Sequence, residues 1–190
     1  MAFHLGCLRA LNDFGLLDEV RVLSSISGGS VIGALYTYSP DLSFEEFDSK
    51  VVEHLKKGFQ DAILRELLKP GNLFPATINC AATKIQTGLA KLGWSEQNVH
   101  RNYSRTDIFA DILNRDLFGS ATLNSDRRND IEAVIGACDL RTGSAFRFGS
   151  KRSGSGRLGE LLKKDTSVGF AVAASAAFPI LLPPIDRTWK

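Results

Sequence analysis

The chain has 190 residues, of which 44% are hydrophobic and 23% charged, and its formal net charge at pH 7 is +2. This length and composition are typical of one globular domain, and the balanced charge argues against nucleic acid as a partner. The longest weakly polar run, residues 168–185, is interrupted by Pro179, Pro183 and Pro184, so no transmembrane segment is predicted.

The N-terminus and the cysteines bear on the location of the protein. The N-terminus lacks the basic start of a signal peptide, and Arg9 and Asp13 interrupt its apolar part. The three cysteines, Cys7, Cys80 and Cys138, lie among apolar residues without the spacing of metal ligands. We therefore expect buried, reduced thiols in a cytoplasmic compartment and no bound metal.

A helix is predicted at the start of the chain, over residues 2–14. Leu5, Leu8 and Leu11 share one face of this helix, and Gly15 ends it. No capping residue precedes the helix, and an α/β domain usually opens with a strand. We therefore expect an element of the domain to be missing before it.

A strand, a tight turn and a helix are predicted in succession between residues 20 and 36. Residues 20–23 form a short apolar run typical of a buried strand, residues 24–30 are mostly small, and residues 31–36 are mostly apolar. This layout resembles a nucleophile elbow, in which a turn holds a serine hydroxyl above a sheet.

Steric crowding selects one serine of this stretch as the candidate nucleophile. A strand packed closely against the following helix requires small residues two positions before and two positions after the nucleophile. Ser27 meets this requirement with Ser25 and Gly29, whereas Ser30 is followed two positions later by Ile32. The serines before Ser27 follow bulky residues and still belong to the strand. We therefore predict that Ser27 lies on the turn, after a strand that ends near Ser25.

The motif around Ser27 also has two other interpretations. Ile26 and Gly28 complete the motif, and a helix that begins near Gly28 would direct its N–H groups at an oxyanion or a phosphate. The same residues between a strand and a helix are typical of an ordinary helix N-cap. A phosphate-binding loop is the third interpretation, although no lysine follows the glycines.

Three amphipathic helices are predicted in the middle of the chain, over residues 43–68, 77–92 and 104–117. Ser104 and Asp107 form a capping-box pattern at the start of the third. Residues 43–117 are long for one connection of a sheet, so we expect a helical insertion or a cap over the site. Trp94 and Tyr103 suit either a lipid-accommodating groove or plain core.

The last third of the chain is predicted to contain a hairpin and a closely packed helix. Residues 130–138 and 144–148 alternate as two strands, and Asp139 caps the turn between them. The basic loop at residues 151–159 serves either solubility or contact with anionic headgroups. The small residues of 168–177 allow a helix to pack closely against other backbone.

Four stretches of the chain resemble blocks of the patatin-like phospholipases, in the family's order. Residues 2–11, AFHLGCLRAL, are similar to the helix after the family's glycine-rich oxyanion loop. Residues 22–30, VLSSISGGS, resemble its nucleophile elbow, in the branch that carries Ser in place of the first Gly. Residues 139–148, DLRTGSAFRF, and residues 173–184, AASAAFPILLPP, resemble later blocks.

This resemblance implies a fold and a chemistry. The implied fold is α/β and three-layered, with a central, mostly parallel sheet flanked by helices; residues 1–190 would form one such domain, incomplete at both termini. The implied enzyme is a serine acyl hydrolase with a Ser–Asp dyad, in which Ser27 attacks an ester carbonyl. Glycine N–H groups, with Gly28 as one candidate, would stabilise the oxyanion. The implied substrates are phospholipids and other acyl-ester lipids, with peripheral membrane contact and neither cofactor nor metal.

Two family features are not found in the sequence. The glycine-rich loop would lie before Met1, and an Asp-Gly-Gly or Asp-Gly-Ala motif is expected shortly after Pro184, but no aspartate of the 190 residues is followed by glycine. Asp186 is followed by Arg187, so the role of the base is not assigned to it. We therefore expect negligible activity from this chain alone, and an exposed sheet edge or apolar surface.

Two alternative functions remain open from the sequence. A Ser–His–acid hydrolase needs a histidine late in the chain, whereas His4 precedes Ser27, and His54 and His100 lie in the helical middle. A catalytically inactive member of the same fold would bind lipid or protein without turnover. An assay of ester hydrolysis separates this binding module from an enzyme.

Overall fold

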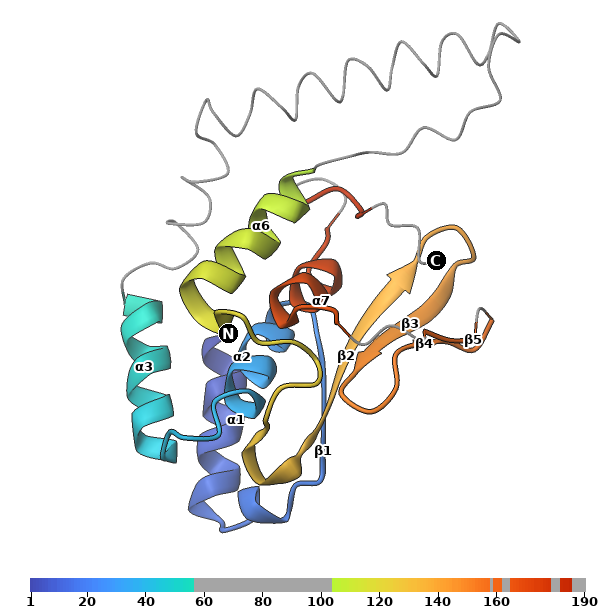
Figure 1. Ribbon diagram of the computed structural model, residues 1–190. Coiled ribbons are helices and arrows are strands. Elements are labelled where there is room, and N and C mark those ends of the chain that lie inside the picture. Colours follow the sequence, from blue (N-terminus) through green and yellow to red (C-terminus); the bar gives the residue numbers. More distant parts are fainter. Residues whose placement is uncertain (57–103, 158, 162–164, 179–181, 186–190) are drawn as a thin grey trace, which may run out of the picture.

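The computed structural model describes residues 1–56, 104–157, 159–161, 165–178 and 182–185 (Figure 1). Its helical elements are α1 (Ala2–Asp13), η1 (Leu17–Glu19), α2 (Gly28–Thr37), α3 (Phe44–Lys56), α6 (Arg105–Leu113), η2 (Asn114–Phe118), η3 (Arg128–Asp130) and α7 (Val168–Ser175). Its strands are β1 (Val22–Ile26), β2 (Glu132–Asp139), β3 (Ser144–Gly149), β4 (Gly154–Ser155) and β5 (Gly159–Glu160).

The strands form one sheet in the order β1-β2-β3-β4-β5. The pair β1–β2 is parallel, with Val22 opposite Glu132 and Ile26 opposite Gly136. The other three pairs are antiparallel, because β2 turns back directly into β3 and the short strands follow. The predicted α/β class is thus confirmed, and antiparallel pairing makes up more of the described sheet than expected.

Two helices pack directly on the sheet. Both α2 and α7 contact β2, and α2 also contacts β1. Helix α6 packs on α7, and α1 contacts both α2 and α3, on the same side of the sheet (Figure 1). The largest side chains with almost no exposure are Phe47, Ile32, Leu113, Leu123, Ile131, Ile135, Val51, Val168 and Val172. The core therefore lies between the sheet and these helices.

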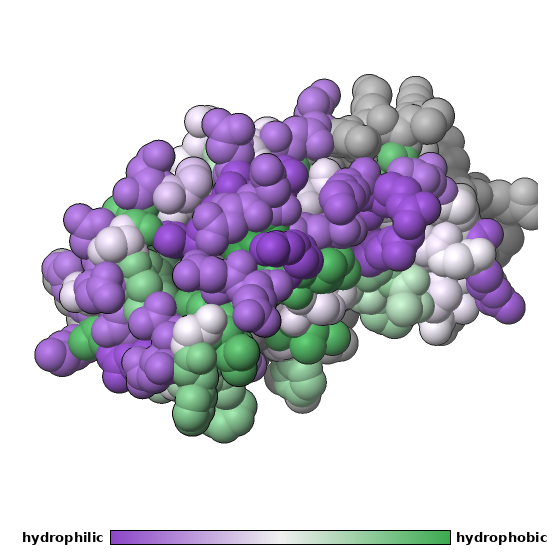
Figure 2. All heavy atoms as spheres, turned by 90° about the horizontal axis from the view of Figure 1, so that it is seen from below, coloured by the Kyte–Doolittle hydropathy of each residue, from purple (hydrophilic) through white to green (hydrophobic). Residues whose placement is uncertain are grey.

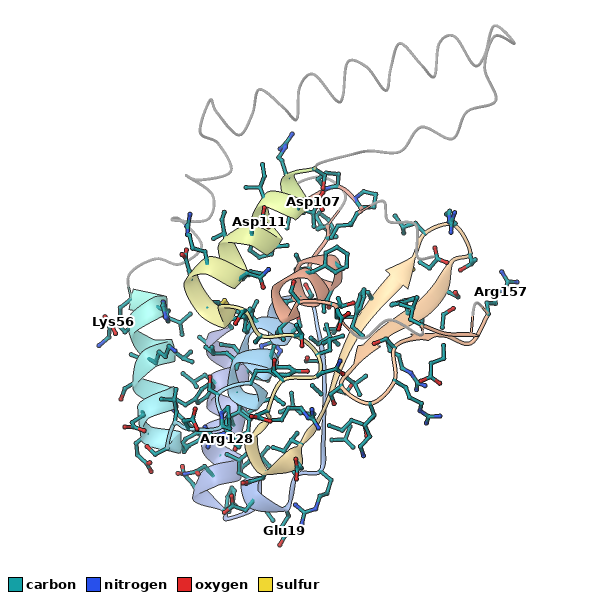
Figure 3. All side chains as sticks on the ribbon, in the orientation of Figure 1. Glu19, Lys56, Asp107, Asp111, Arg128 and Arg157 are labelled. Carbon is teal, nitrogen blue, oxygen red and sulfur yellow. The ribbon has the colours of Figure 1, made fainter. Side chains whose placement is uncertain are left out.

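A single arginine fixes the connection between α2 and α3. The guanidinium of Arg128 donates to the carbonyl oxygens of Ser39 at 2.8 Å and Leu42 at 2.5 Å (Figure 3). It also lies over the ring of Tyr36, 4.7 Å from the ring centroid. Its Nε–H also donates to the Tyr36 carbonyl oxygen at 3.4 Å, and hydrogen bonds from a charged donor are stronger than neutral ones. The turn that follows α2 is therefore held to the segment that leads into β2.

One face of β1 is open. Val22 is 54% exposed and Ile26 is 66% exposed, and β1 is the outermost strand of the described sheet. Leu23 and Ser25 point to the opposite face of the strand and are half-buried against α2. Seen from below, the surface carries hydrophobic patches among hydrophilic side chains (Figure 2). Of the exposed sheet edge or apolar surface expected from the sequence, the exposed apolar side chains are present in the described part.

Most predicted elements are found, with shifted ends. The helix predicted over residues 2–14 is α1, the hairpin is β2–β3, and the helix predicted in residues 168–177 is α7. The strand predicted over 20–23 begins at Val22 and continues to Ile26, because the small residues stay extended while they pair with β2. Helix α6 begins with the predicted capping box and ends at Leu113, where a π-helical turn follows.

The predicted burial of the cysteines is wrong for two of them. Cys7 lies on the exposed face of α1, and Cys138 lies near the end of β2 on the open face of the sheet; both are exposed free thiols. Apolar sequence neighbours did not bury them, because neighbours along a helix or strand point to other faces. Cys80, Trp94, Tyr103 and the helix predicted over 77–92 lie outside the described residues. None of the described helices has the length and hydropathy needed to cross a bilayer.

Candidate active site

Ser27 occupies the turn between β1 and α2. The strand ends at Ile26 and the helix begins at Gly28, so the predicted position of this serine is confirmed. Its backbone has φ 54° and ψ −133°, a conformation that non-glycine residues rarely adopt. Such a conformation costs about 1–3 kcal/mol and persists only where the surroundings enforce it. Ser27 is exposed, so the strained turn presents its side chain to solvent.

Close packing of α2 on β1 sets the position of this turn. A Cβ atom at Gly33 would lie 2.6 Å from Leu23 Cδ2 and 3.1 Å from Ser25 Cβ. Carbon atoms normally approach no closer than about 3.5 Å, so any larger residue at position 33 would require Leu23 and Ser25 to shift. The small residue expected at Ser25 is needed here, and Gly33 is its partner on the helix, which the sequence pattern did not indicate.

Gly29 meets a different neighbour from the one expected. Close packing against β1 was expected at Gly29, but a Cβ atom there would lie 2.9 Å from His4 Nε2. The imidazole of His4 thus lies beside the first turn of α2. Around Gly28 nothing lies within 4 Å of a Cβ position, so the space beside that residue is open.

Two serine hydroxyls engage the backbone of Ser27. The Ser27 N–H donates to Ser175 Oγ at 2.8 Å, and the Ser175 hydroxyl donates to the Gly136 carbonyl oxygen at 2.6 Å. The hydroxyl of Ser30, which is fully buried, donates to the Ser27 carbonyl oxygen at 2.5 Å. From the sequence, Ser30 was only an alternative candidate for the nucleophile, and no pattern indicated a role for Ser175.

The electrostatics of the turn favour negative charge. The first N–H groups of a helix have no intrahelical acceptor, and the helix dipole adds partial positive charge at that end. Helix α2 begins immediately after Ser27, with Gly28 and Gly29 in its first turn. An oxygen that develops negative charge beside Ser27 therefore faces the positive end of a ten-residue helix.

Two described aspartates, at the end of β2 and at the start of α6, have structural partners. Asp139 accepts hydrogen bonds from the Thr142 hydroxyl at 2.8 Å and the Arg141 N–H at 3.0 Å, and these bonds lower the pKa of its carboxyl group. It caps the hairpin turn, as predicted. Asp107 belongs to the capping box at the start of α6, where it accepts from the Ser104 N–H at 2.8 Å (Figure 3).

No described carboxylate or imidazole is hydrogen-bonded to the Ser27 hydroxyl. Asp186 and His100 lie outside the described residues. Within the described residues, no group of three His, Cys, Asp or Glu side chains is suited to hold a metal ion. The described site therefore consists of an exposed serine on a strained turn, the start of a helix, and the hydroxyls that hold the turn.

A comparison with protein-family models matches residues 1–188 to the family described as patatin-like phospholipase. The chain belongs to the patatin-like phospholipase family. Comparisons with curated proteins and with solved structures find no match.

Patatin-like phospholipases are lipid acyl hydrolases, so the family fixes the general class of substrate. The match covers nearly the whole chain and includes all four blocks that the sequence singled out. The turn at Ser27 lies within one of these blocks, and Ser175 lies within another.

Proposed function

We propose that this patatin-like phospholipase chain carries the nucleophile of a lipid acyl hydrolase, and that Ser27 is that nucleophile. The backbone of Ser27 carries the proposal, because a non-glycine residue at φ 54° between a strand and a helix is strained while its side chain stays exposed. Strain of this kind concentrates at functional sites. An ordinary N-cap serine accepts a hydrogen bond from an N–H group of the first helical turn and needs no strained backbone. Ser27 makes no such side-chain cap hydrogen bond.

The proposed chemistry is acyl transfer in two steps. Ser27 Oγ attacks the carbonyl carbon of a phospholipid or other acyl-ester lipid while a base takes the hydroxyl proton, and the alcohol leaves with a proton to give an acyl-enzyme. Water then releases the fatty acid. The Gly28 N–H, at the start of α2, is proposed as one donor to the oxyanion in both steps.

A Ser–Asp dyad is the proposed source of the base. No aspartate among the 190 residues is followed by glycine, and no described carboxylate is bonded to the Ser27 hydroxyl. A serine hydroxyl without a base is a weak nucleophile. We therefore propose that the 190-residue chain alone hydrolyses acyl esters negligibly. A second candidate function is a lipid-binding or protein-binding module without turnover.

Turnover of a p-nitrophenyl ester tests the proposal. The samples are the 190-residue chain, an extended chain with a glycine-rich loop ahead of Met1 and an Asp-Gly-Gly segment after Lys190, and the extended chain with Ser27→Ala. We expect turnover only from the extended chain with Ser27, because nucleophile, base and oxyanion donors act as a unit. Strong turnover by the short chain contradicts the proposed need for these segments. Turnover that survives Ser27→Ala contradicts the role of Ser27.

A further inference from the structure

We infer that Ser175 is a positioning residue for Ser27, and this inference rests on the proposed function of Ser27 as the nucleophile. The Ser175 hydroxyl accepts from the Ser27 N–H at 2.8 Å and donates to the Gly136 carbonyl oxygen at 2.6 Å. One hydroxyl therefore bonds, as acceptor and as donor, to backbone groups of the turn after β1 and of strand β2. It does not touch the reacting atoms in this arrangement; it acts through the backbone of Ser27.

The strain at Ser27 is the reason that such a contact matters. A residue held at φ 54° returns to an ordinary conformation unless its neighbours over-determine its position. The carbonyl oxygen of Ser27 is held from within the next helix, by the hydroxyl and the N–H of Ser30. The N–H of Ser27 is held by Ser175, which lies 148 residues further along the chain. The two sides of the strained residue thus have independent supports.

Three elements of the fold meet at the Ser175 hydroxyl. Ser175 is the last residue of α7, Ser27 follows β1, and Gly136 lies on β2 directly opposite Ile26. Ser175 is half-buried between alanines, and these small neighbours allow the end of α7 to approach the two strands. Residues 173–184 resemble a family block, and through Ser175 this block contacts the turn that holds Ser27.

Removing the hydroxyl should loosen the turn without unfolding the domain. In Ser175→Ala the Ser27 N–H loses its acceptor, but Ser27 is exposed and water replaces the bond. Global stability then changes little, while the local preference for the strained conformation is lost. Ser175→Thr keeps the hydroxyl and should keep the contact.

Amide hydrogen exchange of the 190-residue chain tests the contact directly, and it needs no turnover. The Ser27 amide should exchange roughly 2–10-fold faster in Ser175→Ala, which is the change expected for one lost hydrogen bond to a backbone donor. Ser175→Thr should restore slow exchange. The matched control is Ser167→Ala, which removes the N-cap at the other end of α7, where Ser167 accepts from the Phe170 N–H.

The exchange result has two outcomes that would overturn the inference. Unchanged exchange of the Ser27 amide in Ser175→Ala means that the hydroxyl does not hold the turn. Equal acceleration at Ser27 in Ser167→Ala means that any weakening of α7 has the same effect, so Ser175 has no specific role.

Kinetics of the extended chain separate the inference from the proposed function. Displacement of a nucleophile by about 1 Å costs on the order of a hundredfold in rate, so Ser175→Ala should lower kcat by roughly 10–100-fold with little change in KM. Ser175→Thr should recover most of kcat. A change confined to KM contradicts the positioning role. Turnover that persists in Ser27→Ala refutes the proposed function instead, whatever the exchange data show for Ser175.

Discussion

Gly169 is the position at which the packing of α7 on α6 can be tested most severely. An added Cβ atom there would lie 2.3 Å from Asn114 Oδ1 and 2.9 Å from the backbone oxygen of Ala110. The Gly169 N–H also donates to Asn114 Oδ1 at 3.0 Å, and this bond would be lost when the amide is displaced. Overpacking costs about 1–3 kcal/mol and the lost bond about 1 kcal/mol, while the higher helix propensity of alanine returns about 1 kcal/mol. Gly169→Ala should therefore destabilise the fold by about 1–3 kcal/mol.

Urea denaturation followed by far-UV circular dichroism measures this change. Gly29→Ala is the matched control, since the three atoms nearest to its Cβ position all belong to the ring of His4, which is exposed and can turn away. The control should be neutral or stabilising by up to about 1 kcal/mol through helix propensity. Equal stability of the Gly169→Ala variant and the parent would refute the described contact between α6 and α7.

Three further outcomes follow from the same structure. Ser27→Gly should raise the free energy of unfolding by about 1 kcal/mol in urea denaturation, because glycine accepts the positive φ of the turn; a loss of stability would contradict the strain. The Thr142 hydroxyl lowers the pKa of Asp139, so its contribution is present at neutral pH and fades as pH falls through the folded-state pKa; the difference in Tm between the parent and Asp139→Ala should shrink on acidification. Burial raises the pKa of Tyr38 to about 12, and its hydroxyl donates to the Leu123 carbonyl oxygen, so stability should fall as pH rises above the ordinary tyrosine pKa, and ultraviolet titration of Tyr38→Phe should lack a transition near pH 12 that the parent shows.

The sequence predicted the local part of the site well. Apolar runs on either side of a cluster of small residues placed Ser27 on a turn, because the alternation of strand and helix is a property of neighbouring residues. The capping box at Ser104 was equally predictable, since its two hydrogen bonds join residues three apart. The turn role of Asp139 followed from its own short-range chemistry.

The tertiary part of the site was not predictable by the same means. Ser175 meets Ser27 across 148 residues, and nothing in its alanine-rich surroundings marks it as an acceptor. The partner of Ser25 at the helix crossing is Gly33, and the packing of α2 on β1 that brings them together is set by the fold. The exposure of Cys7 and Cys138 depends on which face of each element is covered, and composition does not contain that information.

Mass spectrometry of the acyl-enzyme tests the central role of Ser27 most directly. The extended chain is mixed with an excess of a p-nitrophenyl acyl ester, quenched in acid within one turnover, and digested. We expect fragmentation of the peptide that contains Ser27 to place one acyl group on Ser27 itself, and no such adduct in the Ser27→Ala variant. An adduct on another residue such as Ser30, or steady turnover without any adduct on the Ser27 peptide, would contradict the account.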